Sequence, residues 1–543
     1  MKRKLLIVFF IFSSLWLSAQ EDLLKLKIKN YHKIHFNHFQ YNELELSFSD
    51  TLHTSLKPLH FFEINNQIIL EKYKQLKLGK KKWLGRKFFD EHFVAIIGND
   101  YWITIDPVIN LSFGKDNLRT DTYTFQNTRG ILVEGTLGKQ FSFSSYIAEN
   151  YARIPVFLDR YIWGTWPRVV PGYEINISED RNYVDYPHAR GYIAYKPSKF
   201  FFFELGHGNH FISDGYRSLF LSDKAGVYPY FKAEATFWKV KYSTIWSAYQ
   251  DIRPEATVNG VYRKKYAATH YIDWNVTSDL NLGFFETVIW HDENDRGFDI
   301  NFLNPVIFFK FSEVHTGSQA SNSLIGLSAR YKLPYGLKVY GQFILDEMTM
   351  QKFFNVKGYW ANKFGYQIGL KYNNAFQIPH LFLRAEYNSV RPYTYGHKVY
   401  TTNYTNNYLP LAHPWGANFE EKIFEIQYSY KRWYISSLIS TGKKGFDYPD
   451  DDYGYGGNIN NYIIPENYSD NVYTLQGNLG EIFFNQTEGG YLLNPATRLK
   501  LFGGIIFRKT NVEVETSTVK NETTKYLYLG IKTQLWNDHF DIF

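Results

Sequence analysis

Apolar and polar side chains alternate along Gly336-Leu337-Lys338-Val339-Tyr340-Gly341-Gln342-Phe343-Ile344-Leu345-Asp346. In an extended strand, successive side chains point to opposite faces. One face therefore carries Leu337, Val339, Phe343 and Leu345, and the other carries Lys338, Tyr340, Gln342 and Asp346. A strand of about ten residues with one apolar and one polar face is typical of a transmembrane β-barrel, whose apolar face meets lipid and whose polar face meets a water-filled lumen.

The same alternation recurs on both sides of this segment. It is clear in Leu381–Ser389 and Lys525–Trp536, and the first such strand is Tyr101–Phe113. We count about 18 strands and allow about 16 to 20, and a barrel with both ends in the periplasm needs an even number. The stretch Phe302–Val314 also has a strand-like pattern. The even count holds only if that stretch belongs to an outer loop or folds into the lumen.

Short and long connections alternate between these strands. Turn-forming residues predict tight connections at 137–140, 196–199, 238–239, 277–280, 333–336, 374–379, 430–432 and 494–497. Long segments lie between them at about 150–188, 209–227, 250–266, 292–322, 347–363, 390–420 and 442–481. Outer-membrane barrels have short periplasmic turns and longer extracellular loops. The sequence therefore predicts an all-β fold, a transmembrane antiparallel β-barrel.

The composition favours a membrane barrel over a helical membrane protein. Aromatic residues make up 19% of the chain, with 45 Tyr and 46 Phe, yet the mean hydropathy is −0.36. Aromatic girdles at both membrane interfaces, with an apolar residue at every second strand position, account for both values. After the N-terminal apolar run, no stretch of about 18 apolar residues follows, which excludes helical spans.

The N-terminus has the order of a secretory signal peptide: Lys2-Arg3-Lys4, an apolar run Leu5–Leu17, and then Ser18-Ala19-Gln20. We expect a signal peptide over 1–19, an N-terminal periplasmic segment over 20–98 and the barrel over 99–543. The expected location is the outer membrane. Because the chain has no cysteine, cysteine lipidation, disulfides and thiol catalysis are excluded.

The expected periplasmic segment lacks regular alternation and carries a basic cluster: Lys72, Lys74, Lys77, Lys80, Lys81, Lys82, Arg86 and Lys87. Such a cluster suits contact with peptidoglycan, anionic lipid or an assembly protein, or it is a solvated face without a partner. At the other end, the chain finishes with Phe540-Asp541-Ile542-Phe543. An aromatic residue after an alternating last strand resembles the signal that barrel-assembly machinery recognises, so that machinery and outer-membrane lipid are expected partners.

The long loops are rich in aromatic and arginine side chains. Sugars present apolar C–H faces that pack on aromatic rings, and their hydroxyl and carboxylate groups need fixed donors such as Arg. Glycan-binding candidates in the loops at 150–188 and 390–420 are Arg153, Tyr161, Trp163, Trp166, Arg168, Tyr173, Tyr393, Tyr395, His397 and Trp415. The alternative is that these side chains pack loop against loop or form the interface girdle.

The sequence offers little for catalysis or for a metal. His207 and His210 are three apart, so on a strand they face opposite sides, and Asp450-Asp451-Asp452 lacks the ligand spacing of a calcium loop. We expect no enzyme activity, no catalytic residue, no cofactor and no metal. The formal charge of +7 fits attraction to acidic polysaccharide or lipid as well as ordinary solubility. Export disfavours nucleic-acid binding.

One segment carries a family resemblance: Gly208-Asn209-His210-Phe211-Ile212-Ser213-Asp214-Gly215-Tyr216-Arg217-Ser218-Leu219-Phe220-Leu221-Ser222-Asp223, followed by Tyr228-Pro229-Tyr230. It resembles the part of Wzi-type capsule assembly outer-membrane β-barrels in which a glycine-rich loop precedes a Ser-Leu-(apolar)-Leu-Ser-(Asp/Asn) stretch. Leu52–Pro58, Val339–Glu347 and Leu411–Phe419 are similar to the branch of gliding-bacteria proteins associated with gliding motility. Tyr216 and Arg217 join the glycan-binding candidates.

The resemblance implies a barrel of about 18 strands that helps to assemble or anchor capsular polysaccharide or another exopolysaccharide at the cell surface, through its outer loops. The N-terminal region departs from the family, because it shows no match to the periplasmic helices of enterobacterial members. Two alternatives stay open: a gliding-motility or adhesion accessory barrel, and a diffusion porin. The sequence does not fix the glycan, the openness of the lumen or the oligomeric state.

Overall fold

The computed structural model describes residues 33–45, 48–49, 51–64, 74–164, 168–291, 297–307, 321–348, 351–352, 358–464 and 470–543. The expected signal peptide, residues 1–19, lies outside these residues and stays a prediction. No helix in the described part of the chain is long and apolar enough to cross a membrane.

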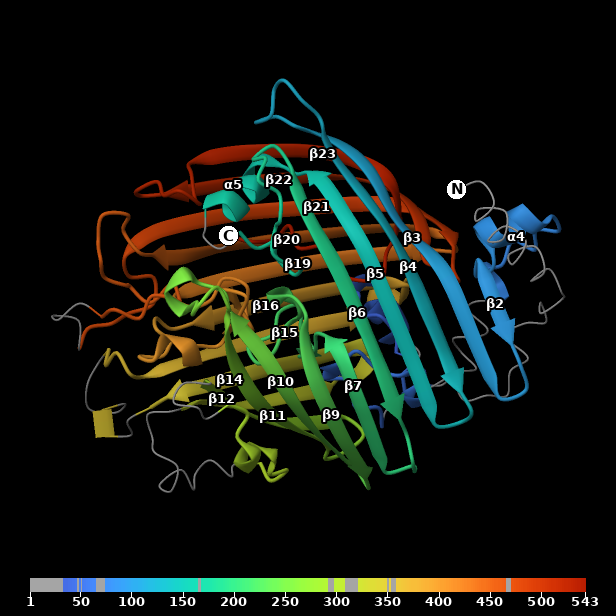
Figure 1. The fold of residues 1–543 in the computed structure, drawn as a ribbon, viewed down its shortest axis with the longest axis horizontal. Helices are drawn as coiled ribbons and strands as arrows, with labels where there is room; N and C mark the ends of the chain where they lie inside the picture. Colours follow the sequence, from blue (N-terminus) through green and yellow to red (C-terminus); the bar gives the residue numbers. More distant parts are fainter. Residues whose placement is uncertain are drawn as a thin grey trace.

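Within the described residues, 18 antiparallel strands close into a barrel (Figure 1). Each strand pairs with the next one of the wall, and β23 pairs with β3 to complete the circle. The strands are β3 (Tyr101–Asp116), β4 (Thr124–Leu137), β5 (Phe141–Arg153), β6 (Val184–Tyr195), β7 (Phe201–Gly208), β9 (Tyr228–Phe237), β10 (Val240–Asp251), β11 (Arg263–Asn275), β12 (Leu280–His291), β13 (Ser321–Lys332), β14 (Leu337–Glu347), β15 (Lys363–Asn373), β16 (Leu381–Val390), β19 (Phe419–Tyr430), β20 (Trp433–Phe446), β21 (Asn478–Asn494), β22 (Leu499–Val512) and β23 (Glu522–Thr533).

The predicted fold class and the strand count are confirmed. β12 and β13 pair directly, so no further wall strand lies between them, as the even count required of the ambiguous stretch 302–314. Its residues 302–307 lie in the connection, and 308–314 lie outside the described residues. The last strand ends at Thr533 rather than at Trp536.

Each predicted tight connection joins two neighbouring strands at one end of the barrel. The two-residue turns Trp238-Lys239 and Lys431-Arg432 have a positive φ at the first residue, 51° and 54°. Such turns match the right-handed twist of the flanking strands. We call this the tight-turn end, which faces the periplasm in barrels of this class, and we call the opposite end the loop end.

The wall has an apolar outer face and a buried inner face. Along β5, Ile147 is 58% exposed to the outside, whereas its neighbour Ala148 is 2% exposed and faces inward. Polar inward side chains such as Ser142 and Asn150 are equally buried. A water-filled lumen would leave them hydrated, so the inner face indicates a lumen filled by the protein itself.

Four segments fill the lumen, and together we call them the plug: the described residues of 33–64, then 209–227, 391–418 and 534–543. Leu219 in the second segment donates its backbone N–H to Gln342 of β14 (2.8 Å), and Phe220 stacks on Phe285 of β12 at 4.6 Å. In Figure 1 the C-terminus lies inside the ring of strands. The elements of the plug are α2 (His38–Glu45), β1 (Leu56–Lys57), η2 (Phe61–Glu63), β8 (Phe211–Ile212), η3 (Asp223–Ala225), η10 (Tyr400–Thr402), β17 (Thr405–Asn406) and β18 (Leu409–Pro410).

The remaining elements lie in the connections and at the tight-turn end. They are α4 (Trp83–Phe89), β2 (Val94–Ile97), α5 (Val156–Gly164), η4 (Pro254–Ala256), η6 (Ile300–Leu303), η8 (Pro334–Gly336) and η9 (Ala375–Gln377). β2 pairs with the part of β3 that extends past the end of β23.

The expected N-terminal segment consists of two differently placed parts. In the first part, Glu45 forms ion pairs with Lys338 (2.8 Å) and Lys371 (3.0 Å) of the inner wall. The second part, residues 74–97, carries α4 and β2 at the tight-turn end. The division at residues 19 and 98 stays a prediction.

The C-terminal aromatic residue is placed inside the barrel. The ring of Phe543 lies 5.0 Å from that of Trp415 and 4.9 Å from that of Phe446. It therefore does not end the last strand, and its recognition by assembly machinery stays a prediction.

Candidate functional site

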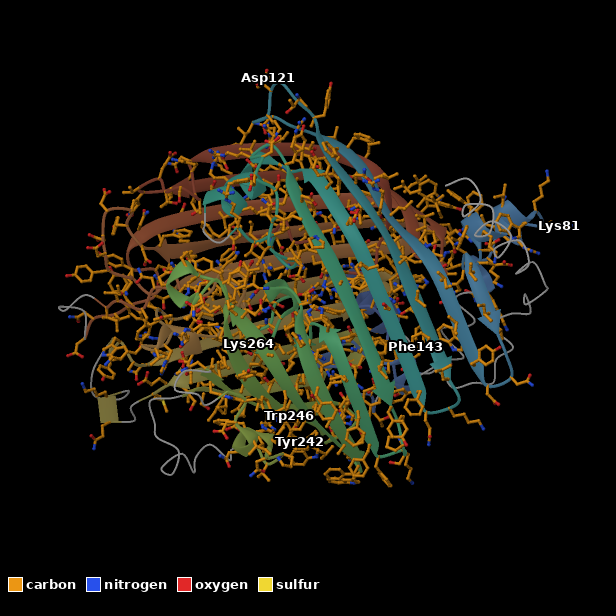
Figure 2. All side chains as sticks on the ribbon, viewed as in Figure 1. Lys81, Asp121, Phe143, Tyr242, Trp246 and Lys264 are labelled. Carbon is orange, nitrogen blue, oxygen red and sulfur yellow. The ribbon has the colours of Figure 1, made fainter. Side chains whose placement is uncertain are left out.

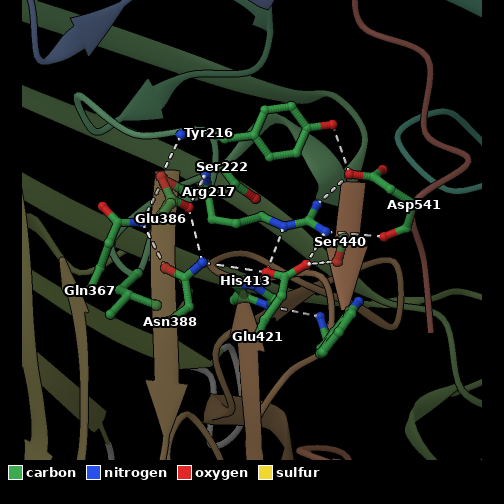
Figure 3. Close-up of polar contacts among 12 residues, drawn as sticks. Tyr216, Arg217, Ser222, Gln367, Glu386, Asn388, His413, Glu421, Ser440 and Asp541 are labelled. Carbon is green, nitrogen blue, oxygen red and sulfur yellow. Dashed lines mark hydrogen bonds and ion pairs between the residues drawn. The ribbon is translucent and has the colours of Figure 1, made fainter. Parts of the chain in front are cut away.

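Arg217 lies at the centre of the plug, where it joins three parts of the chain (Figure 3). Its Nη2 and Nε donate to the two carboxylate oxygens of Glu421 on β19, at 2.6 and 3.1 Å. Its Nη1 donates to Oδ2 of Asp541 in the C-terminal segment at 2.7 Å. The side chain is 1% exposed. A two-point contact between guanidinium and carboxylate fixes orientation as well as charge, so Arg217 ties the plug to the wall.

A second wall carboxylate holds the same segment by its backbone. Glu386 of β16 accepts from the N–H groups of Tyr216 (2.7 Å) and Arg217 (3.1 Å). Gln367 of β15 donates to the carbonyl oxygen of Arg217 at 3.0 Å. Buried backbone groups need such partners, and here the inner wall supplies them in place of water.

Asp541 fixes the end of the chain. Its carboxylate accepts from Arg217, from Lys224 Nζ at 3.1 Å and from the Tyr216 hydroxyl at 2.8 Å. Burial alone would raise the pKa of Asp541, but the charges of Arg217 and Lys224 outweigh it and hold that pKa below its usual value. Asp541 is therefore ionised throughout the physiological range.

His413 completes the cluster from the 391–418 segment. Its Nε2 lies 2.7 Å from Glu421 Oε2, and the Trp415 N–H donates to its Nδ1 at 3.1 Å. Burial, helped by Arg217 and Lys444, lowers the pKa of His413 to about 4 despite the neighbouring Glu421. The ring is neutral at pH 7, and because Nδ1 accepts, its proton is on Nε2 and is donated to Glu421.

The glycan-binding candidates fall into two groups. Those buried in the plug or beneath the outer loops are Tyr216, Arg217, Tyr393, Tyr395 and Trp415. The Tyr395 hydroxyl, for example, donates to the carbonyl oxygen of Leu219 at 2.8 Å. These side chains pack segment against segment, which is the alternative that the sequence left open. Their contact with a glycan stays a prediction.

The other candidates are half-buried: Arg153, Tyr161, Trp163, Arg168, Tyr173 and His397. The guanidinium of Arg168 lies 4.0 Å from the ring centre of Trp163, beside α5. Arg153, by contrast, donates to the Tyr183 hydroxyl (2.7 Å) at the end of β5. Trp166 lies outside the described residues.

The structure adds an aromatic and cationic surface at the loop end that the sequence analysis missed. Trp360 lies 5.9 Å from Tyr359 and 6.2 Å from Tyr462, between ring centres. Lys352 is exposed, and its Nζ lies 4.1 Å from the ring centre of Tyr359. Lys363 Nζ lies 4.7 Å from the ring centre of Tyr462, but this side chain is 1% exposed and pairs with Glu347 at 2.9 Å. We call these five residues the outer aromatic platform, whose three rings are half-buried. The adjacent Tyr359-Trp360 was visible in the sequence, but the approach of Tyr462 from another loop was not.

Two cavities formed by the described residues are small. One beside the C-terminal segment measures about 50 Å³, and one at the tight-turn end, lined by Phe39, Lys431 and Trp433, measures about 130 Å³. Ligand sites for small molecules usually measure roughly 300–1,000 Å³. These two cavities are too small to carry a polymer through the lumen.

The solved structures that match this chain include outer-membrane proteins. One is Wzi of Escherichia coli, described as an outer membrane protein involved in group 1 capsule assembly and as a carbohydrate-binding β-barrel. The identity is 13%, the match covers 92% of this chain and 99% of that chain, and the TM-score is 0.53. OprD of Pseudomonas aeruginosa matches at 12% identity over 80% of this chain and 95% of that chain, with a TM-score of 0.41. At these identities the likeness concerns the fold alone.

Comparison with curated protein sequences gives no match. The family model for the capsule assembly protein Wzi matches residues 166–438. The match includes the plug segment around Arg217, the platform residues Tyr359 and Trp360, and the wall from β6 to the first part of β20. The family match does not assign the chain to a branch of gliding-bacteria proteins, so membership of that branch stays a prediction. Since the matched region is half of the 543 residues, this outer-membrane barrel belongs to the capsule assembly protein Wzi family.

Proposed function

We propose that this protein is a non-enzymatic barrel that helps to assemble or anchor capsular polysaccharide, or another exopolysaccharide, at the outer surface. The observation that carries the proposal is the inward folding of the 209–227 and 391–418 segments, which fill the lumen and leave aromatic and cationic side chains half-buried at the loop end. Membership of the capsule assembly family supports the same reading.

The outer aromatic platform suits a glycan chemically. Rings such as Trp360 and Tyr462 offer flat faces to the C–H side of a sugar, and Lys352 offers a cation to a uronate or another acidic group. Arg168 and Trp163 offer the same combination beside α5. Weak contacts repeated along a polymer add up by multivalency, so a closed barrel with shallow surface sites can hold a long chain.

The test is surface retention of polysaccharide. Cell-bound and shed glycan are measured in the wild type, in a deletion strain and in the complemented strain. We expect the deletion to move glycan from the cells into the medium and the complementation to restore it. Unchanged cell-bound glycan in the deletion strain contradicts the proposal. If such a strain also fails to spread on a surface, the gliding or adhesion alternative takes its place.

The porin alternative predicts an open channel. Purified protein in a planar bilayer should show no stable conductance if the plug closes the lumen. A steady single-channel conductance in the wild type would favour the porin and remove the main support for the anchoring role.

A further inference from the structure

The basic cluster of the N-terminal segment has no part in the plug or in the platform. The described residues of the cluster belong to the segment 74–97 at the tight-turn end, where β2 lies beside β3 and α4 precedes β2 (Figure 1). We propose that this segment is an interfacial membrane anchor that binds the anionic headgroups of the periplasmic leaflet and inserts Trp83, Leu84 and Phe88 between them. This role goes beyond glycan retention and does not depend on it.

The anchor segment continues the lipid-facing wall. On β3, Trp102 and Thr104 are buried and face inward, so Ile103 and Ile105 face outward. Their cross-strand partners on β2 are Ile96 and Val94. Directly opposite residues of paired strands share a face. β2 therefore extends the apolar outer surface, and α4 precedes it by only a short link.

The position of α4 is fixed by polar contacts to the turns of the barrel. Asp90, at the end of α4, accepts from Arg432 Nη2 (2.8 Å) in the β19–β20 turn. It also accepts from the N–H groups of Leu78 (2.7 Å) and Lys80 (3.1 Å). Asn494 at the end of β21 donates to the carbonyl oxygens of Lys87 (2.9 Å) and Glu91 (2.8 Å). These contacts hold the segment at the rim of the tight-turn end.

Held there, α4 exposes large apolar side chains. Trp83 is 45% exposed, Leu84 73% and Phe88 50%, and no residue of the helix is buried. An apolar patch of this kind, rimmed by charge, marks a surface that another phase or partner covers. Its position in line with the lipid-facing wall makes the bilayer that phase.

The charge around the patch matches an anionic surface. Lys74, Lys77, Lys80, Lys81 and Lys82 are all exposed. Figure 2 shows Lys81 pointing away from the barrel. Two acidic side chains lie nearby: Asp90 pairs with Arg432 (2.8 Å), and Glu91 pairs with Arg86 (3.6 Å) and Lys87 (3.4 Å). Neither pairs with the five exposed lysines in these contacts. Aromatic and aliphatic side chains beside exposed lysines are the composition of helices that lie in the headgroup region.

The absence of cysteine from the chain allows a single spin label to be placed. A nitroxide is attached to the full-length Leu84→Cys protein, which is placed in vesicles of phosphatidylethanolamine and phosphatidylglycerol. The rate at which the nitroxide collides with oxygen, which dissolves in lipid, is compared with the rate at which it collides with a water-soluble nickel chelate. We expect the label to collide several-fold more with oxygen than with the chelate. The matched control is Asp121→Cys at the loop end, which Figure 2 shows projecting from the barrel and which should show the opposite preference.

The charge contribution is tested in the same protein. One change is the triple variant Lys80→Gln, Lys81→Gln and Lys82→Gln, and the other is the use of neutral phosphatidylcholine vesicles in place of the anionic ones. Each change should lower the ratio of oxygen collisions to chelate collisions several-fold. Leu84 and the three lysines are exposed, so these substitutions disturb little packing. They do remove the contact of Lys80 Nζ with the Phe89 ring, 5.6 Å from its centre. A label at 84 that stays open to the chelate in anionic vesicles overturns the proposal. Shielding that appears only after purified peptidoglycan is added also overturns it, in favour of a cell-wall contact.

Discussion

Arg217 and Asp541 are 324 positions apart in the sequence, yet Nη1 of the guanidinium lies 2.7 Å from Oδ2 of the carboxylate inside the barrel. The pair joins the segment with the family resemblance to the C-terminal segment. Since Glu421 contacts the same guanidinium, one side chain connects two plug segments and the wall.

Replacing Arg217 by methionine should strongly destabilise the barrel. The variant leaves Glu421 and Asp541 buried without their shared cation, and removing one partner of a buried pair costs about 3–5 kcal/mol. The urea midpoint of the detergent-solubilised protein measures the loss. Arg181→Met, at an exposed arginine, is the matched control and should shift the midpoint little. An equal shift in the two variants would contradict the role given to Arg217.

Removing residues 536–543 should open a path through the lumen. β23 ends at Thr533, so the wall keeps its strands, while the contacts of Asp541 and Phe543 are lost. We expect the truncated protein to show channel openings in a planar bilayer that the full-length protein lacks. The control is Phe543→Leu, which keeps an apolar side chain beside Trp415. A truncated barrel that stays closed would mean that the other three plug segments suffice.

Stability should fall as the pH drops from about 6.5 to 4. The unfolded chain protonates His413 near its ordinary pKa of 6.5, whereas burial lowers the folded pKa to about 4. Between these values the unfolded state binds more protons, so the contribution of His413 is complete above pH 6.5 and declines below it, by up to about 3 kcal/mol. His413→Gln should flatten the pH dependence of the urea midpoint in this window. His380→Gln, at an exposed turn residue, is the control for replacing a histidine by glutamine outside the plug.

Loss of platform rings should weaken glycan retention without harming the fold. An aromatic contact contributes about 0.5–1.5 kcal/mol, so Trp360→Ala with Tyr462→Ala should release a measurable share of cell-bound polysaccharide. Tyr335→Ala, at the tight-turn end and 86% exposed, is the matched aromatic control and should retain glycan normally. Equal retention in the double variant and in the Tyr335→Ala control would place the glycan contact elsewhere. Trp163 and Arg168 would then be the next residues to replace.

Much of the wall was predictable because membrane barrels encode it locally. The alternation around Val339 and Phe343 fixes which face meets lipid, and the turn at Trp238-Lys239 fixes a register. Each signal is contained within a few neighbouring residues. The predicted strand count and tight connections followed from them.

The filling of the lumen was not predictable in the same way. Polar inward residues such as Arg384 and Glu386 occur in the sequence whether they face water or protein. Glu386 in fact accepts backbone N–H groups from Tyr216 and Arg217, a contact over about 170 positions. The outer aromatic platform escaped prediction for the same reason, since Trp360 and Tyr462 meet only after the loops fold.

The contacts across the lumen also determine how the barrel responds to force. Lys33 pairs with Glu204 on β7, Leu219 bonds to Gln342 on β14, and Arg217 bonds to Glu421 on β19. These ties reach well-separated strands, so flattening the tube requires breaking buried polar contacts and not only bending strands. A pull on the outer loops is therefore shared around the circumference. Resistance of the tube to flattening would suit the proposed retention of a polymer layer that moves in flow.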